Sequence, residues 1–192
     1  MIGMKHDAPL IVATEGVLAG IAGAVAVTLV GTVGRKIVVG REQSDPAHVA
    51  GTEAGEVLSD GPDMPPNMNR VTATFVQKLA TGIFGASLSP DQQYIAGTAW
   101  HLTYGGGWGL LYALIQSSVS VPAAVLGPAY GLALWLIGPG WLVPRMKLML
   151  PPNQQRPRII AMVLSLHVAF GAVVALIFHA LSRVGRTGGP RR

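Results

Sequence analysis

Residues 159–181 read IIAMVLSLHVAFGAVVALIFHAL and contain no aspartate, glutamate, lysine or arginine. A helix that crosses about 30 Å of hydrocarbon needs roughly 20 predominantly apolar residues, and this run is long enough. Three further runs are also long and predominantly apolar: 10–33, 94–115 and 121–143. Because a backbone in lipid must satisfy its own hydrogen bonds, each run predicts a helix. We therefore predict an all-α membrane protein with four transmembrane helices.

The overall composition supports a membrane location. Of the 192 residues, 50% are hydrophobic and 12% are charged, about half of the quarter that is usual in soluble domains. The mean hydropathy is +0.45. These values exclude an ordinary cytosolic domain, and we expect the chain to lie in the lipid bilayer of the inner (cytoplasmic) membrane. Because the chain has no cysteine, disulfides, zinc–thiolate sites and iron–sulfur clusters are excluded.

The charges are distributed unevenly along the chain. All nine acidic residues lie at or before Asp91, whereas residues 92–192 hold eight lysines and arginines. These basic residues cluster between the apolar runs and at the C-terminus, where they would meet lipid headgroups. A nucleic-acid binder needs a basic face on a soluble module, so we expect no nucleic-acid partner.

A polar segment separates the first apolar run from the second. Residues 34–70 are rich in Gly, Asp, Glu and Pro and predict a polar loop. In residues 71–84, apolar side chains recur at near-helical spacing: Val71, Phe75, Leu79 and Ile83. This pattern predicts a short amphipathic helix, which either lies in the membrane interface or packs on the transmembrane bundle. We treat residues 1–192 as a single membrane domain.

The second and fourth runs contain similar sequences. His101-Leu-Thr-Tyr-Gly-Gly-Gly-Trp-Gly-Leu-Leu-Tyr112 matches His167-Val-Ala-Phe-Gly-Ala-Val-Val-Ala-Leu-Ile-Phe178, at an offset of 167 − 101 = 66 residues. Duplicated helix pairs recur in membrane folds. We therefore predict that the four helices form a duplicated helix pair, with the two imidazoles at the same depth across a pseudo-two-fold axis.

These features resemble small bacterial inner-membrane proteins of the YagU-like kind. The resemblance rests on the repeated His-x-x-aromatic-Gly-x-x-x-small pattern, on Pro65-Pro66 before the amphipathic stretch, and on the glycine-rich first helix. It covers most of the chain outside residues 34–64. It implies the fold and adds little about activity, because such families are largely uncharacterised.

The two matched histidines are the predicted cofactor-binding residues. His101 and His167 could serve as axial ligands of haem b or a chlorophyll-type pigment, with Gly105 and Gly171 one turn away clearing space for the macrocycle. Alternatively, each imidazole hydrogen-bonds a neighbouring helix while the glycines permit close packing; the partners considered are Thr98, Tyr104 and Ser165. Two histidines without a nearby carboxylate do not make a divalent metal site.

Small residues predict helix contacts elsewhere. Gly16-x-x-x-Gly20 in the first run offers a close-approach surface to another helix, and the predicted packing positions are Gly16, Gly20, Gly23, Gly97 and Gly109. Glu15 is the one acidic residue inside a predicted span. It either lies at the membrane interface or carries a proton.

The sequence contains no phosphate-binding loop, Ser-His-Asp set or paired carboxylates, so we expect no catalytic residues and no enzyme. Our leading hypothesis is an accessory or structural subunit, without a cofactor, whose small-residue faces pack against other membrane subunits or against further copies of itself. The alternative is a carrier of haem b or a pigment for electron or energy transfer through His101 and His167. A weaker alternative is a proton-coupled permease or acid-stress protein that uses Glu15.

Overall fold

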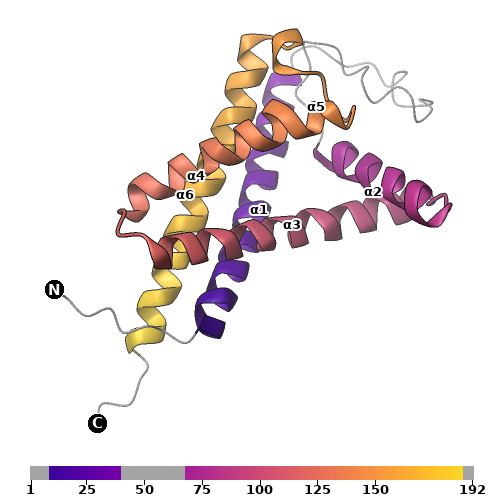
Figure 1. The fold of residues 1–192 in the computed structure, drawn as a ribbon. Helices are drawn as coiled ribbons and strands as arrows, with labels where there is room; N and C mark the ends of the chain where they lie inside the picture. Colours follow the sequence, from indigo (N-terminus) through magenta and orange to yellow (C-terminus); the bar gives the residue numbers. More distant parts are fainter. Residues whose placement is uncertain (1–8, 40–67, 188–192) are drawn as a thin grey trace.

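The computed structural model describes residues 9–39 and 68–187, and every regular element within them is helical. Four long helices dominate the fold (Figure 1): α1 (Pro9–Val39), α3 (Pro90–Ser118), α4 (Ala123–Ile137) and α6 (Pro157–Thr187). The shorter elements are α2 (Met68–Phe84), the π-helical turn η3 (Gly138–Leu142), α5 (Val143–Arg145) and the 3-10 turn η4 (Pro152–Gln154). The predicted all-α class is confirmed. Most of the predicted loop, at 40–67, lies outside the described residues.

The four long helices pack in the spatial order α3–α1–α6–α4. The most extensive contacts join α1 to α3 and α4 to α6, followed by α1 to α6, whereas α3 hardly touches α4 or α6. Figure 1 shows α3 crossing α1 and α4 crossing α6. Each of the three extensive contacts joins antiparallel helices, as the residue pairs given below demonstrate. The two central helices are therefore the first and the last in the chain.

Three of the helices are long and apolar enough to cross a membrane. They comprise Pro9–Val33, Ala123–Arg145 and Pro157–Val184, and they confirm the prediction of a membrane protein. The helix α3, predicted as a fourth span at 94–115, is not among them. Its glycines, its histidine and its hydroxyl-bearing side chains lower the hydropathy of that stretch.

The third predicted span, 121–143, is not one continuous α-helix. Pro122 precedes the first residue of α4, and the helix ends where Gly138-Pro139-Gly140 begins the π-helical turn η3. Because Pro139 has no N–H, it cannot form a regular helical hydrogen bond. The backbone instead closes a wider turn, in which the N–H of Val143 donates to the carbonyl of Gly138.

The amphipathic helix α2 packs on the first half of α3. The rings of Phe75 and Trp100 lie 4.8 Å apart, and a Cβ atom on Gly97 would lie 2.9 Å from the backbone nitrogen of Ala73. The far end of α2 leaves Ile83 and Phe84 exposed. The structure therefore shows the bundle contact that the sequence left open, while an interfacial position of the exposed end stays a prediction.

The buried core lies where all four long helices meet. Tyr112 of α3 is fully buried, and its ring contacts Tyr130 of α4 at 5.4 Å and Phe178 of α6 at 6.1 Å between centroids. The Tyr130 hydroxyl donates to the carbonyl oxygen of Trp108 at 2.6 Å. This bond and the Tyr112–Tyr130 ring contact tie α4 to α3, although the backbones of the two helices come close at few positions.

Candidate functional site

The backbones of α1 and α3 touch where glycines on the two helices meet. A Cβ atom placed on Gly16 would lie 2.5 Å from the Cβ atom of Ala113, and one on Gly109 would lie 2.5 Å from the Cα atom of Gly20. Both distances are far below ordinary van der Waals contact. Small residues four positions apart permit this close approach, so the predicted Gly16-x-x-x-Gly20 surface is used within the chain.

A second glycine crossing joins α4 to α6, and the sequence analysis missed it. A Cβ atom on Gly127 would lie 2.7 Å from the Cβ atom of Ala175, and one on Gly171 would lie 2.7 Å from the backbone nitrogen of Gly131. The signal was present in the sequence, because Gly127-x-x-x-Gly131 repeats the spacing of the first helix.

The remaining predicted packing glycines also lie at helix contacts. A Cβ atom on Gly23 would lie 2.9 Å from the Cγ2 atom of Val174, at the central contact between α1 and α6. Gly97 lies against α2, as described above. All five glycines predicted for packing are therefore buried against a neighbouring helix.

His101 forms a hydrogen bond with α1. Its Nε2 atom lies 3.1 Å from the hydroxyl oxygen of Thr28. The Thr28 hydroxyl donates to the carbonyl of Ala24 at 2.8 Å, so its oxygen is left to accept a hydrogen bond from the Nε2–H group. This arrangement assigns the proton to Nε2 and engages that nitrogen in a link between helices.

His167 bonds within its own helix. Its Nδ1 atom lies 2.8 Å from the carbonyl oxygen of Val163, to which it donates. A hydrogen bond to a neighbouring helix therefore describes His101, with a partner other than those considered, but not His167. Two of the hydroxyls considered, those of Thr98 and Ser165, donate to carbonyls one turn back in their own helices.

The helix contacts do not follow the predicted offset of 66 residues. Gly109 contacts Gly16 and Gly20 in the first crossing, and Gly171 contacts Gly127 and Gly131 in the second. Equivalent positions in the second helices are thus 171 − 109 = 62 residues apart. At an offset of 62 residues, Gly105 is the residue equivalent to His167. The carbonyl of Gly105 lies against Gly20, just as the carbonyl of His167 lies against Gly131. His101 therefore lies one helical turn before the position in α3 that is equivalent to His167, and the two histidines are not equivalent.

The space expected beside the histidines is filled by neighbouring helices. A Cβ atom on Gly105 would lie 2.6 Å from the Cβ atom of Ala24 in α1, and one on Gly171 would meet the α4 backbone. These two glycines therefore admit a helix where clearance for a macrocycle was predicted. Among the described residues, no three His, Asp or Glu side chains gather in a way that could hold a metal ion.

Glu15 lies at the end of the bundle where α1 begins and α6 ends. Its Oε2 atom accepts a hydrogen bond of 2.7 Å from the hydroxyl of Ser182, and its side chain is half-buried. The carboxylate thus links the two central helices. Its predicted roles, at the interface or as a proton carrier, stay predictions.

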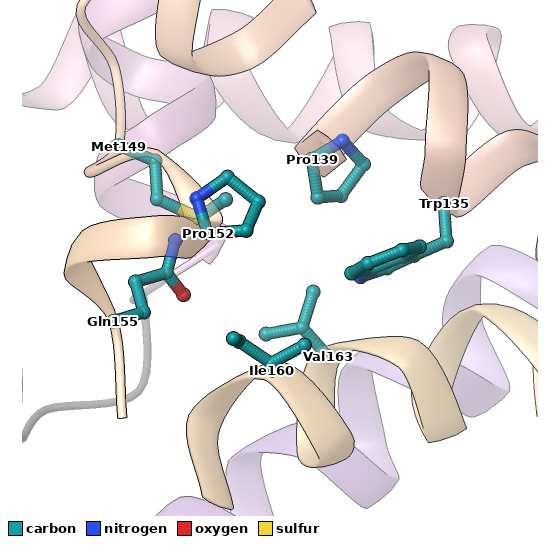
Figure 2. Close-up of a pocket in the computed structure, with 7 residues that line it drawn as sticks. All are labelled: Trp135, Pro139, Met149, Pro152, Gln155, Ile160 and Val163. Atoms are coloured by element: carbon teal, nitrogen blue, oxygen red, sulfur yellow. The ribbon is translucent and has the colours of Figure 1, made fainter. Parts of the chain in front are cut away.

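A small recess lies between η3 and the start of α6 (Figure 2). Trp135 and Gln155 face into it from opposite sides, and the remaining lining is apolar; it consists of Pro139, Met149, Pro152, Ile160 and Val163. The buried Nε1 atom of Trp135 has no hydrogen-bond partner among the described residues. An apolar recess with one indole donor and one amide offers hydrogen bonding but no acid, base or nucleophile.

No family model, no curated protein and no solved structure matches this chain. The resemblance to YagU-like proteins therefore stays a prediction. The two glycine crossings and the side chains that surround them are the features that bear on function.

Proposed function

We propose that the protein is a non-catalytic integral protein of the inner membrane and acts as an accessory or structural subunit of a larger membrane assembly. The observation that carries this proposal is the set of apolar side chains that the bundle leaves exposed. The small-residue faces, which were expected to meet a partner, contact one another instead. Both glycine crossings are closed within the chain, so the helices turn bulky apolar side chains outward. On α1 these are Leu18, Val25 and Leu29, and on α4 they are Val125, Leu132 and Leu136.

In this proposal α3 is the fourth transmembrane helix. Gly105, Gly109 and His101 are covered by α1, so these hydropathy-lowering groups are turned away from lipid. The exposed hydroxyls of Thr98 and Thr103 donate to carbonyls of their own helix. Its 29 residues would extend about 43 Å at 1.5 Å per residue, more than the hydrocarbon thickness. Only the connection 119–122 separates α3 from α4, so the two helices meet at the same side of the membrane.

We further propose that the two crossings arose by duplication. Trp108-Gly109 and Ala113-Leu114-Ile115 correspond to Phe170-Gly171 and Ala175-Leu176-Ile177 at an offset of 62 residues. In the partner helices, Gly16 and Gly20 correspond to Gly127 and Gly131 at an offset of 127 − 16 = 111. The two offsets differ by 111 − 62 = 49 residues. An insertion of this length between α1 and α3, which includes α2, accounts for the difference.

Site-directed cross-linking tests the subunit proposal directly, because the natural chain has no cysteine. Single cysteines replace the outward residues Leu18, Val25 and Leu132 in full-length protein, and native membranes are treated with a bifunctional thiol-and-amine reagent. We expect a product of higher mass from at least one outward face and none from Ala19→Cys, whose side chain is fully buried. Absence of any product from cysteines on all outward faces would refute the proposal.

Visible absorption of the purified protein tests the same proposal against cofactor binding. We expect no Soret or pigment band, because neighbouring helices occupy the space beside Gly105 and Gly171. A Soret band that disappears in both His101→Ala and His167→Ala would replace the subunit proposal with haem b binding.

A further inference from the structure

Three basic residues lie at one bend of the chain. The ammonium group of Lys78 in α2 donates to the carbonyl oxygen of Met146 at 2.9 Å. Arg145 and Lys147 flank Met146 in the chain, and both are exposed. The contact with α2 therefore brings a third cation, 68 residues distant in sequence, to the bend after α5.

No carboxylate of the described residues neutralises these three cations. Residues 9–39 and 68–187 include two carboxylates, Glu15 and Asp91. Glu15 lies at the opposite end of the bundle, bonded to Ser182, and neither carboxylate forms a salt bridge with the three cations. Within residues 9–39 and 68–187, no acidic side chain therefore compensates the charge of Lys78, Arg145 and Lys147.

A lysine occupies a strained backbone position at the bend. Lys147 has a φ angle of 55°, which is the one positive φ at a non-glycine residue among those described. Glycine or asparagine would adopt this conformation at lower cost. Strained residues of this kind are concentrated at functional sites, where the side chain is needed in that position.

The bend also has the features of a membrane boundary. It directly follows the apolar stretch Ala123–Arg145 and precedes Pro157–Val184. The Arg145 guanidinium lies 5.4 Å from the centre of the Trp141 ring, and the Trp141 side chain is 56% exposed. Exposed tryptophan beside arginine at the end of a transmembrane helix is the arrangement found at headgroup depth.

We propose that Lys78, Arg145 and Lys147 form a binding site for the phosphate group of an anionic phospholipid. The three cations supply the charge-assisted hydrogen bonds, and the exposed apolar side chains of Trp141 and Leu142 receive the adjoining acyl chain. A headgroup rather than a free phosphate fits the site, because polar and apolar contacts lie side by side. The inference rests on the membrane placement proposed above.

Titration of the detergent-purified full chain with short-chain phospholipids tests this site. Native mass spectrometry counts bound dioctanoyl phosphatidylglycerol and dioctanoyl phosphatidylcholine. We expect one saturable site that prefers phosphatidylglycerol. The double variant Arg145→Gln/Lys147→Asn should weaken that site about 30-fold, the combined effect expected for two basic residues near a lipid phosphate. Asparagine tolerates the positive φ, and Lys78 keeps its bond to Met146, so the bend is expected to fold.

The matched control is Arg183→Gln, which removes an exposed positive charge from the opposite end of the bundle. We expect this variant to bind phosphatidylglycerol as the natural protein does. Equal affinity for the two lipids, or equal losses in the double variant and the control, would refute the site. Full competition by inorganic phosphate at the lipid's own concentration would show a free-anion site and would also refute it.

If the double variant does not fold, Lys147→Asn alone provides the test, with an expected loss of about fivefold. Each of these outcomes leaves the cross-linking test of the subunit proposal unaffected.

Discussion

Replacing Gly109 with alanine provides a direct measure of how much the first glycine crossing stabilises the fold. The added Cβ atom would lie 2.5 Å from the Cα atom and 2.6 Å from the backbone nitrogen of Gly20. Ordinary van der Waals contact begins at 3.4 Å, so α1 and α3 must separate by about 1 Å at the crossing. Because the obstructing atoms belong to the backbone, no side-chain rotation can relieve the overlap.

We expect the Gly109→Ala variant to be destabilised by roughly 1–3 kcal/mol, which is the usual cost of overpacking a close contact. The matched control is Gly107→Ala, two residues away in the same helix, where nothing lies within 4 Å of the added Cβ atom. Alanine favours a helix over glycine by about 1 kcal/mol, so this control should be neutral or slightly stabilised.

The two variants are compared by unfolding in mixed micelles with increasing sodium dodecyl sulfate, followed by tryptophan fluorescence and circular dichroism. The predicted difference between the variants is roughly 1–3 kcal/mol, the overpacking cost, because both variants share the helix-propensity gain of alanine over glycine. Equal transition midpoints in Gly109→Ala and Gly107→Ala would show that α1 and α3 do not touch through their backbones. This result would refute the close approach of the helices at both crossings.

Three further outcomes are expected in the same unfolding assay. Gly131→Ala should destabilise the fold by an amount similar to Gly109→Ala, since its Cβ atom would lie 2.8 Å from the Cα atom of Val168; a neutral result would contradict the second crossing. Thr28→Val removes the partner of the α3 histidine and should cost about 1 kcal/mol, whereas Thr32→Val, whose hydroxyl bonds only its own helix, should cost less. Ser182→Ala removes the hydrogen bond to the α1 carboxylate and should cost roughly 0.5–1.5 kcal/mol, and an unchanged midpoint would show that this bond does not form.

The sequence predicts the helices well because apolar run length follows directly from the thickness of the bilayer. Small residues four positions apart in the first run likewise predicted a contact surface, and the structure uses Gly16 and Gly20 in that way. The boundaries were less accurate at Gly138–Leu142, because one proline inside an apolar run does not reveal whether the helix bends or changes its turn width.

The register of the two halves could not be predicted in the same way. Identical histidines suggested an alignment at an offset of 66 residues. The helix contacts depend instead on glycine and alanine, which align easily by chance in a sequence rich in both. The position of α2 was equally ambiguous, because the apolar face of an amphipathic helix has the same periodicity whether it meets lipid or another helix. The contacts in the structure, such as those of Phe75 with Trp100 and of Ala73 with Gly97, distinguish the two.

The order α3–α1–α6–α4 has a consequence for biogenesis. The helix α1 leaves the ribosome before α6, the other central helix, which it contacts. Until Phe170 and Val174 have been synthesised, the Gly23 side of α1 lacks its partner, although its other side can already receive α3. A chain truncated before α6 therefore exposes to the surrounding membrane a face of α1 that α6 otherwise covers.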